Sequence, residues 1–541
     1  MASDLTNDAI ADRLLAFAGL LELAESNPYA ARAYRRAAEM IRSTPTSVAA
    51  LVREGRARDL RGIGASIESK LRELVETGDI AELHELETEL QPELIGLGRL
   101  LGLSTRRILD IGSVLGVRTA EDLRAAAAEG RLGSVPGIGP STEARINAAL
   151  AERPAPRQGL TLNRAQALTE AVAGGLGGYA AGDARRCCEL SFDLAVVSAA
   201  EDAEPVLRRF AELPLIVAVV ERAERRAVGV TVEGVPITVT VAEPHLLGTA
   251  LVRATGSAAY AEALEPLPEG ATEEEVFAGL GIPWRPPELR EVDAPECFEN
   301  LLELRDIRGD LHCHTAWSDG RASVMEMGAA AIERGYEYLA ICDHTVSVRV
   351  VPGLDEDDLR RQSEEIAAAN EQLAPFRVLR GVECDILPDG TLDIRDEVLA
   401  ELDWVQISLH AGQRRTRDEL TRTVCEAMRN PHACALSHPK GRILNRRPEN
   451  ALDLDAVFEV ALETGLAVEI NGLPDRLDLS SRHAREALVA GIDIVVASDA
   501  HSTGSLASLE NAVATARRAG ASRHQIRNTR PLDELRRPSL A

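Results

Sequence analysis

The spacing of apolar positions predicts helices in the first 150 residues of the chain and a mixture of helices and strands after them. In the first part, apolar residues recur every three or four positions, as at 10–17 and 33–38, which is typical of amphipathic helices. Farther along, β-branched runs at 215–220 and 235–241 alternate with helical stretches. This alternation indicates an α/β module between about residues 160 and 257.

From about residue 305, the chain repeats short apolar runs that each end in a His, Asp or Glu. Two examples are the run 338–341 before His344 and the run 492–497 before Asp499. Parallel strands of a β/α barrel present their functional side chains at their carboxyl ends. The pattern therefore predicts a barrel with a polar site at one end.

Length and composition fit a multidomain protein of the cytoplasm. A chain of 541 residues is long enough for two to four domains, and Pro-rich stretches at 153–157 and 282–288 mark expected connectors. No apolar run approaches the roughly 20 residues that cross a bilayer, and residues 1–8 lack a signal-peptide pattern. The eight cysteines show no disulfide spacing, which predicts reduced thiols.

The charge of the chain limits how it binds nucleic acid. A formal charge of −26 argues against non-specific binding over the whole surface. The first 150 residues are nearly balanced in charge, so local binding remains compatible with the sequence. Only two of the 60 Lys and Arg residues are Lys, namely Lys70 and Lys440. A Lys in this chain is unusual enough to suggest a specific role.

Six of the eleven histidines fall at the predicted strand ends, together with three carboxylates. His312 and His314 are two positions apart, so their side chains project from one face of a strand. The nine candidate ligands are His312, His314, Asp319, His344, Glu383, His410, His438, Asp499 and His501. Nine ligands are too many for one ion, so we expect two or three divalent ions of Mn, Zn or Fe. Barrel histidines that only form hydrogen bonds are the alternative.

Such a cluster of ions suits the hydrolysis of a phosphate ester. One ion lowers the pKa of a water molecule, and a second ion holds the leaving oxygen. Lys440 and Arg442 follow His438 closely, and we expect them to hold the substrate phosphate. The alternative for both cations is an ordinary solvated loop.

Two short segments of the first 150 residues repeat an apolar-Gly-apolar-Gly hairpin that opens a helix. One contains Gly62 and Gly64, and the other contains Gly137 and Gly139. Glycines let such a turn approach a phosphate, and the amides at the helix start attract it. We therefore expect DNA binding at both hairpins, with 100–106 as a degraded third copy. An ordinary turn between helices is the alternative for each single copy.

With these motifs in view, the chain resembles the bacterial family X DNA polymerases over nearly its whole length. Segment 27–38 resembles the opening helices of that family, and 306–312 resembles the start of its polymerase and histidinol phosphatase (PHP) domain. The resemblance implies a multidomain fold with an α-helical N-terminal domain carrying helix-hairpin-helix motifs, an α/β nucleotidyltransferase-like palm and a C-terminal distorted β/α (TIM-like) PHP barrel. The expected boundaries are 1–95 for the lyase-like domain with the first hairpin, 96–157 for the second helix-hairpin-helix region, 158–290 for the palm with a truncated thumb, and 305–541 for the PHP domain.

The palm departs from the pattern of the resembling family at its metal-binding and nucleotide-binding positions. The affected positions are Gly182, Asp183 and Arg185 in the nucleotide-binding turn and Ser191, Asp193 and Thr238 at the expected metal carboxylates. Two-metal nucleotidyl transfer needs carboxylates that hold both ions, and Asp193 alone does not supply them. We therefore expect polymerase activity to be lost and the palm to act as a scaffold.

Lys70 follows the first hairpin at the spacing of the Lys that attacks a sugar aldehyde in the resembling lyase domains. A Schiff base needs a primary amine, which Arg does not supply. Lyase activity is therefore a second expected chemistry. A phosphate-binding or solvated Lys is the alternative.

The favoured function is a DNA-repair enzyme that processes 3′ ends as a metal-dependent 3′–5′ exonuclease. The expected partners are DNA with gaps, 3′ ends or abasic sites and base-excision-repair proteins, in a nucleoid-associated cytoplasmic protein without a membrane partner. The sequence does not choose among exonuclease, abasic-site endonuclease and 3′-phosphatase roles. A phosphatase of a small metabolite, similar to histidinol phosphatases, and a non-catalytic DNA-end scaffold are the other two hypotheses.

Overall fold

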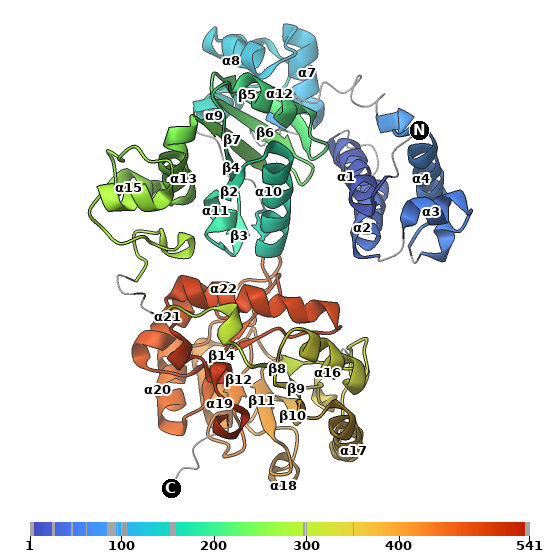
Figure 1. The fold of residues 1–541 in the computed structure, drawn as a ribbon, viewed down its shortest axis with the longest axis vertical. Coiled ribbons are helices and arrows are strands. Elements are labelled where there is room, and N and C mark those ends of the chain that lie inside the picture. The colour runs from blue at the N-terminus through green and yellow to red at the C-terminus, as the bar shows by residue number, and fades with distance from the viewer. Residues whose placement is uncertain are drawn as a thin grey trace. The chain divides into compact units, whose positions relative to one another are not determined.

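The computed structural model describes residues 5–535 except 24–27, 45–46, 61, 84–93, 95, 99–100, 102, 104, 152–157, 296–297, 299 and 350. The connector predicted at 153–157 and part of the third hairpin predicted at 100–106 fall outside these residues. The chain forms two compact units. The first unit comprises residues 1–160, 164–185 and 191–284, and the second comprises 161–163, 186–190 and 285–541. Figure 1 shows the elements of both units, coloured along the chain.

The first unit begins with helices, as the apolar spacing predicts. Their bounds are α1 Asn7–Leu23, α2 Pro28–Ser43, α3 Val48–Arg53, α4 Ala65–Thr77, α7 Thr105–Leu115, α8 Ala120–Ala128 and α9 Pro140–Ala151. The helices α1 and α2 pack on each other through buried side chains such as Phe17 and Tyr34, whose rings meet edge to face at 4.9 Å.

A mixed sheet follows in the same unit, with its strands in the order β2-β4-β7-β6-β5. The strands are β2 Tyr179–Ala181, β4 Leu194–Ala199, β5 Ile216–Ala223, β6 Arg226–Thr231 and β7 Pro236–Ala242. The accompanying helices are α10 Leu162–Leu176, α11 Gly182–Arg185, α12 Glu204–Glu212, α13 Leu247–Thr255, α14 Ala258–Ala263 and α15 Glu273–Gly279, and two short strands are β1 Leu160–Thr161 and β3 Leu190–Ser191. The predicted α/β module is thus confirmed.

Seven parallel strands in chain order, β8 to β14, make the sheet of the second unit. They are β8 Gly309–Cys313, β9 Tyr338–Ile341, β10 Arg377–Asp385, β11 Trp404–Ser408, β12 Ala435–Leu436, β13 Ala467–Asn471 and β14 Ile494–Ala497. The segment after β14 returns to β8, because the His314 amide donates to the Ala500 carbonyl at 2.7 Å and the Asp499 amide donates to the His312 carbonyl at 3.0 Å. These bonds nearly close the sheet into the predicted barrel.

Helices cover the outside of this barrel in Figure 1. They are α16 Val324–Glu333, α17 Glu356–Leu373, α18 Asp396–Leu399, α19 Arg417–Ala427, α20 Leu454–Thr464, α21 Ser481–Ala490 and α22 Leu509–Ala519. Every residue of β8, β9, β11, β13 and β14 is buried, as expected for parallel strands enclosed on both faces. Among the described residues of the whole chain, no helix is long and apolar enough to cross a membrane.

Candidate metal centre

The nine predicted ligands come together in the second unit, in or just beyond the barrel strands. His312 lies within β8 and Glu383 within β10, and both are buried. The other seven follow strands, namely His314 and Asp319 after β8, His344 after β9, His410 after β11, His438 after β12, and Asp499 and His501 after β14. Parallel strands end on one side of the barrel, which is why residues nearly 200 positions apart become neighbours.

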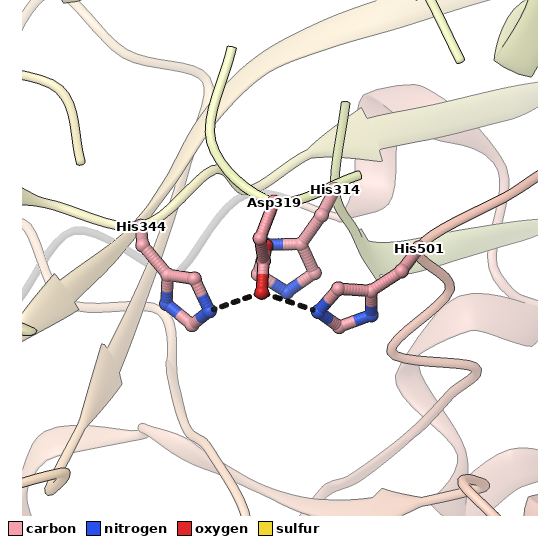
Figure 2. A group of neighbouring side chains, drawn as sticks. All are labelled: His314, Asp319, His344 and His501. Atoms are coloured by element: carbon pink, nitrogen blue, oxygen red, sulfur yellow. Dashed lines mark ion pairs between the residues drawn. The ribbon is translucent and has the colours of Figure 1, made fainter. Parts of the chain in front are cut away.

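One group of ligands surrounds the Asp319 carboxylate (Figure 2). Its Oδ2 atom lies 3.3 Å from Nε2 of His501 and 3.8 Å from Nε2 of His344. The Nδ1 atom of His314 lies 3.8 Å from the other carboxylate oxygen. Three imidazoles around one carboxylate, with one donor atom from each side chain pointing inward, form a ligand set for a divalent ion.

Two further groups share members with the first. His312 and His314 approach Asp499, with their Nε2 atoms 3.9 Å and 3.1 Å from its Oδ1 atom. The Glu383 carboxylate lies 2.8 Å from His344 Nδ1 and 3.4 Å from His410 Nε2. Each of these groups could hold a metal ion, and the number of ions stays a prediction.

The buried donor atoms of this centre fit bound metal ions. The Nε2 atom of His312, the Nδ1 atoms of His314, His344 and His438, and both oxygens of Glu383 are buried and form no well-directed hydrogen bond in the described structure, although His344 Nδ1 and Glu383 Oε2 lie 2.8 Å apart. Unsatisfied buried polar atoms are costly, so several at one point call for a partner. Imidazole nitrogens beside carboxylate oxygens are the donors that Mn, Zn or Fe accept.

The carboxylates Glu383 and Asp319 are held in the ionised form that binds cations. Burial alone would raise the pKa of Glu383, but His410, His344 and His312 hold it well below its ordinary value. Burial likewise opposes ionisation of Asp319, yet the hydrogen bond from His501 lowers its pKa to about 2. Burial lowers the pKa of His314 to about 3, and His344 adds to that effect. Ionised carboxylates and neutral imidazoles are the forms that bind metals. At His312, His344 and His501, burial is outweighed by neighbouring carboxylates that raise the pKa, so metal binding there would release protons.

Residues behind the ligands orient them, and the sequence analysis missed these residues. Nδ1 of His312 lies 2.7 Å from Oε1 of Glu469, which is fully buried in β13. Nδ1 of His410 lies 3.3 Å from Oδ1 of Asp385. Such contacts fix which imidazole nitrogen faces the metal. The available signal for Glu469 was a carboxylate between the apolar residues Val468 and Ile470.

Lys440 and Arg442 direct their cationic groups into the protein. The Lys440 ammonium, on a residue only 7% exposed, donates to the Leu452 carbonyl at 2.9 Å. The Arg442 guanidinium donates to the Arg476 carbonyl at 2.9 Å and lies 2.8 Å from the Glu189 carboxylate. These contacts fasten the loop after β12, and a phosphate-binding role for either residue stays a prediction.

The two predicted hairpins have the same local geometry. In the first, the Ile63 amide donates to the Leu60 carbonyl at 3.2 Å, and in the second the Ile138 amide donates to the Val135 carbonyl at 3.0 Å. The third residues of these turns, Gly62 and Gly137, have φ of +90° and +84°, which favours glycine. Gly64 caps α4, and Gly139 immediately precedes α9.

Lys70 lies on α4 of the first unit, and its amine is held in ion pairs. Its Nζ atom lies 3.0 Å from a carboxylate oxygen of Glu82 and 3.2 Å from one of Glu73. Burial would lower the pKa of Lys70, but the two glutamates outweigh it and raise the pKa. A Schiff base forms from the neutral amine, so these contacts oppose the lyase chemistry, which stays a prediction.

The altered palm positions lie around β3, β4 and β7. Ser191 is buried in β3, and Asp193 is exposed just before β4. Thr238 lies on β7 opposite Ala195 of β4.

Gly182, with φ of +64°, opens the short helix α11, in which Asp183 is the second residue. Arg185 at the end of that helix donates to both oxygens of Glu273, at 2.8 and 2.7 Å.

Three family models match the chain. They are a helix-hairpin-helix domain at residues 5–80, a DNA polymerase beta thumb at 260–291 and a PHP domain at 310–472. The PHP match covers seven of the nine ligands, from His312 to His438. The thumb match covers most of α14 and all of α15, in the segment where a truncated thumb is expected from the sequence.

Curated relatives extend these matches to the whole chain. The "DNA polymerase/3′-5′ exonuclease PolX" of Bacillus subtilis (strain 168) is 31% identical over 95% of this chain and 96% of its own length. A "Probable phosphatase" of Acetivibrio thermocellus is 32% identical over 36% of this chain and 78% of its own length, and one of Syntrophotalea carbinolica is 29% identical over 40% and 90%. The chain therefore belongs to the family X DNA polymerases with helix-hairpin-helix, polymerase-beta-type thumb and PHP domains.

Proposed function

We propose that this protein is a DNA-repair enzyme that hydrolyses the 3′ ends of DNA in its PHP domain and no longer extends them in its palm. The observation that carries the proposal is the gathering of the nine His, Asp and Glu side chains in the second unit. Eight of them form the three candidate groups, and the ninth, His438, lies 3.0 Å from Glu383. The two hairpins of shared geometry would supply a grip on DNA. The Bacillus subtilis relative is named as both a DNA polymerase and a 3′-5′ exonuclease, and the exonuclease half of that name supports the proposal.

Divalent ions bound to this centre would supply an activated nucleophile and neutralise the charge of the phosphate. The side chains that would hold them are pre-oriented by the protein. The Glu469 carboxylate lies 2.7 Å from Nδ1 of His312 and would accept a hydrogen bond from its N–H group, so that Nε2 faces the ligand cluster. His501 does the same through its Nδ1 atom, 2.8 Å from the Asp499 carbonyl oxygen. Arg476, 3.7 Å from the Asp499 carboxylate, adds a cation at the edge of the centre.

Loss of polymerase activity is supported by the palm residues themselves. Hydroxyl side chains stand at Ser191 and Thr238, where the resembling palms carry metal-binding carboxylates, and a hydroxyl does not replace a carboxylate as an Mg²⁺ ligand. Asp183 places a negative charge in the turn expected to hold a triphosphate. Arg185 is already occupied by the Glu273 carboxylate.

The test uses a gapped duplex labelled at the 5′ end of the strand whose 3′ end borders the gap, with Mn²⁺ present. Wild-type protein is expected to shorten that strand, and His312→Ala/His314→Ala is expected to lose at least about 100-fold in rate, because two members of the centre are removed. Addition of the four deoxynucleoside triphosphates is expected to give no extension. The matched control is His245→Ala, an exposed histidine of the first unit.

Three outcomes would contradict parts of this proposal. Extension of the strand would show that Asp193 and its neighbours still support nucleotidyl transfer. Release of phosphate from small phosphomonoesters without strand shortening would favour the metabolite phosphatase, in keeping with the relatives named as probable phosphatases. DNA binding without any hydrolysis would favour the scaffold.

A further inference from the structure

An arginine-lined pocket opens beside the metal centre, within the second unit. It has a volume of about 760 Å³ and shares the ligand His410 as part of its wall. The loop after β11 and the loop after β12 form the rest. The charged residues that line it are Arg414, Arg415, Arg446, Arg447 and Glu449. Four arginines against one glutamate contrast with a chain whose net charge is −26.

These arginines are not neutralised by the protein. In the described part of the chain, no carboxylate forms an ion pair with Arg414, Arg415, Arg446 or Arg447, although most charged side chains nearby are paired. Arg415 is positioned by neutral groups, since its guanidinium donates to the Gly412 carbonyl at 3.1 Å and to the Thr423 hydroxyl at 3.2 Å. Unpaired cations gathered in a pocket provide an electrostatic site for anions.

A further cation connects the pocket with the metal centre. Burial lowers the pKa of Arg447, and the positive charge of Arg476 lowers it further. Arg476 in turn lies 3.7 Å from the Asp499 carboxylate. Arg476 is therefore a cation close both to the candidate ligand Asp499 and to the pocket residue Arg447.

The two loops that form the pocket are locked in place without a ligand. The Gln413 side chain donates to the Leu409 carbonyl at 2.8 Å and packs so closely on Gly441 that a Cβ atom there would lie 2.2 Å from Gln413 Oε1. In the second loop, the amide and carbonyl groups of Ile443 and Arg447 bond each other at 2.9 and 2.7 Å. The site is therefore preorganised, which reduces the entropic cost of binding.

Guanidinium groups bind phosphate oxygens through paired hydrogen bonds, and four of them exceed what one reacting phosphate uses. We propose that this pocket binds the neighbouring phosphodiesters of the DNA strand whose terminal phosphodiester lies at the metals, and so selects polynucleotides over small phosphate esters. This inference rests on the proposed exonuclease function. The arginines contact the backbone, so the preference is for chain length and not for base sequence.

The test compares Arg446→Ala/Arg447→Ala with Arg360→Ala/Arg361→Ala, a neighbouring pair of exposed arginines on α17. Both full-length variants receive a single-stranded oligonucleotide and thymidine 5′-(p-nitrophenyl phosphate), a diester with only one phosphate. In the pocket variant, the KM for each substrate is compared with that of the wild type. The fold-increase for the oligonucleotide should be at least about ten times the fold-increase for the small diester. The association constant for the oligonucleotide should also depend less on salt in the pocket variant. The slope of its logarithm against the logarithm of the salt concentration should be smaller in magnitude by about 0.7 for each phosphate that the variant no longer binds. Neither change is expected in the α17 control.

An Arg446→Lys/Arg447→Lys variant should recover part of the oligonucleotide affinity, because charge is kept while the paired hydrogen bonds are removed. Equal losses on both substrates would overturn the inference by placing the arginines at the reacting phosphate. An unchanged KM for the oligonucleotide would overturn it as well. Wild-type protein that fails to hydrolyse any oligonucleotide would instead refute the proposed function on which it rests.

Discussion

At the scale of single residues, the metal ligands depend on side chains that never reach the metal. The buried carboxylate of Glu469 lies 2.7 Å from His312 and also accepts the His438 amide at 2.7 Å. The nine candidate ligands could be picked out from the sequence, because each lies in or after a short apolar run in a recurrent pattern. Glu469 could not, since its role depends on β13 lying next to β12 in the barrel, a pairing that no local pattern records.

We expect Glu469→Gln to weaken metal binding by about 10- to 100-fold, the usual effect of removing such a partner. The neutral amide of the variant lacks the negative charge with which the Glu469 carboxylate fixes the tautomer of His312. Titration of the metal-free protein with Mn²⁺ or Zn²⁺ measures the change, and Glu459→Gln, on the exposed side of α20, is the control. Equal affinities of the two variants would show that Glu469 does not support the centre.

At the scale of elements, strands with strong apolar runs are predictable and short ones are not. The runs predicted at 338–341 and 492–497 correspond to β9 Tyr338–Ile341 and β14 Ile494–Ala497. The strand β12 has only two residues, Ala435–Leu436, yet it holds the register for His438. Its position comes from pairing with β11 and β13 on either side. Lys440 illustrates the same limit, because its rarity marks a specific role while only the structure shows the bond to Leu452.

The loop after β12 gives a prediction at this scale. Gly441→Ala is expected to destabilise the protein more than Gly465→Ala, although both glycines have positive φ. The backbone strain costs about 1–2 kcal/mol in each case, but only at Gly441 does the new Cβ atom meet another side chain, that of Gln413. The resulting overpacking should add about 1–3 kcal/mol. Calorimetry of the full-length variants measures the difference. Identical unfolding midpoints for the two variants would mean that Gln413 moves away from residue 441 without a cost in stability.

At the scale of the whole molecule, the chain combines a candidate metal centre that keeps all nine predicted ligands with a palm whose expected carboxylate positions are altered. The nine ligands all belong to the second unit, whereas Ser191, Asp193 and Thr238 belong to the first. The family resemblance predicted this division because its motifs run along the chain in order. It did not predict the arginine pocket, since Arg414 and Arg446 lie in different loops and only the barrel brings these loops together.

Because all of these ligands lie in one unit, removal of metal should affect the two units differently. Bound metal at 100 times its dissociation constant contributes about 2.7 kcal/mol to stability, which corresponds to roughly 5–10 °C in a unit of this size. Dialysis against EDTA is therefore expected to lower one calorimetric transition by that amount and leave the other in place. The His312→Ala/His314→Ala variant assigns the transition, because its midpoint should already be low and should respond little to EDTA. A uniform shift of both transitions would mean that the units unfold as one and that the metals stabilise the entire chain.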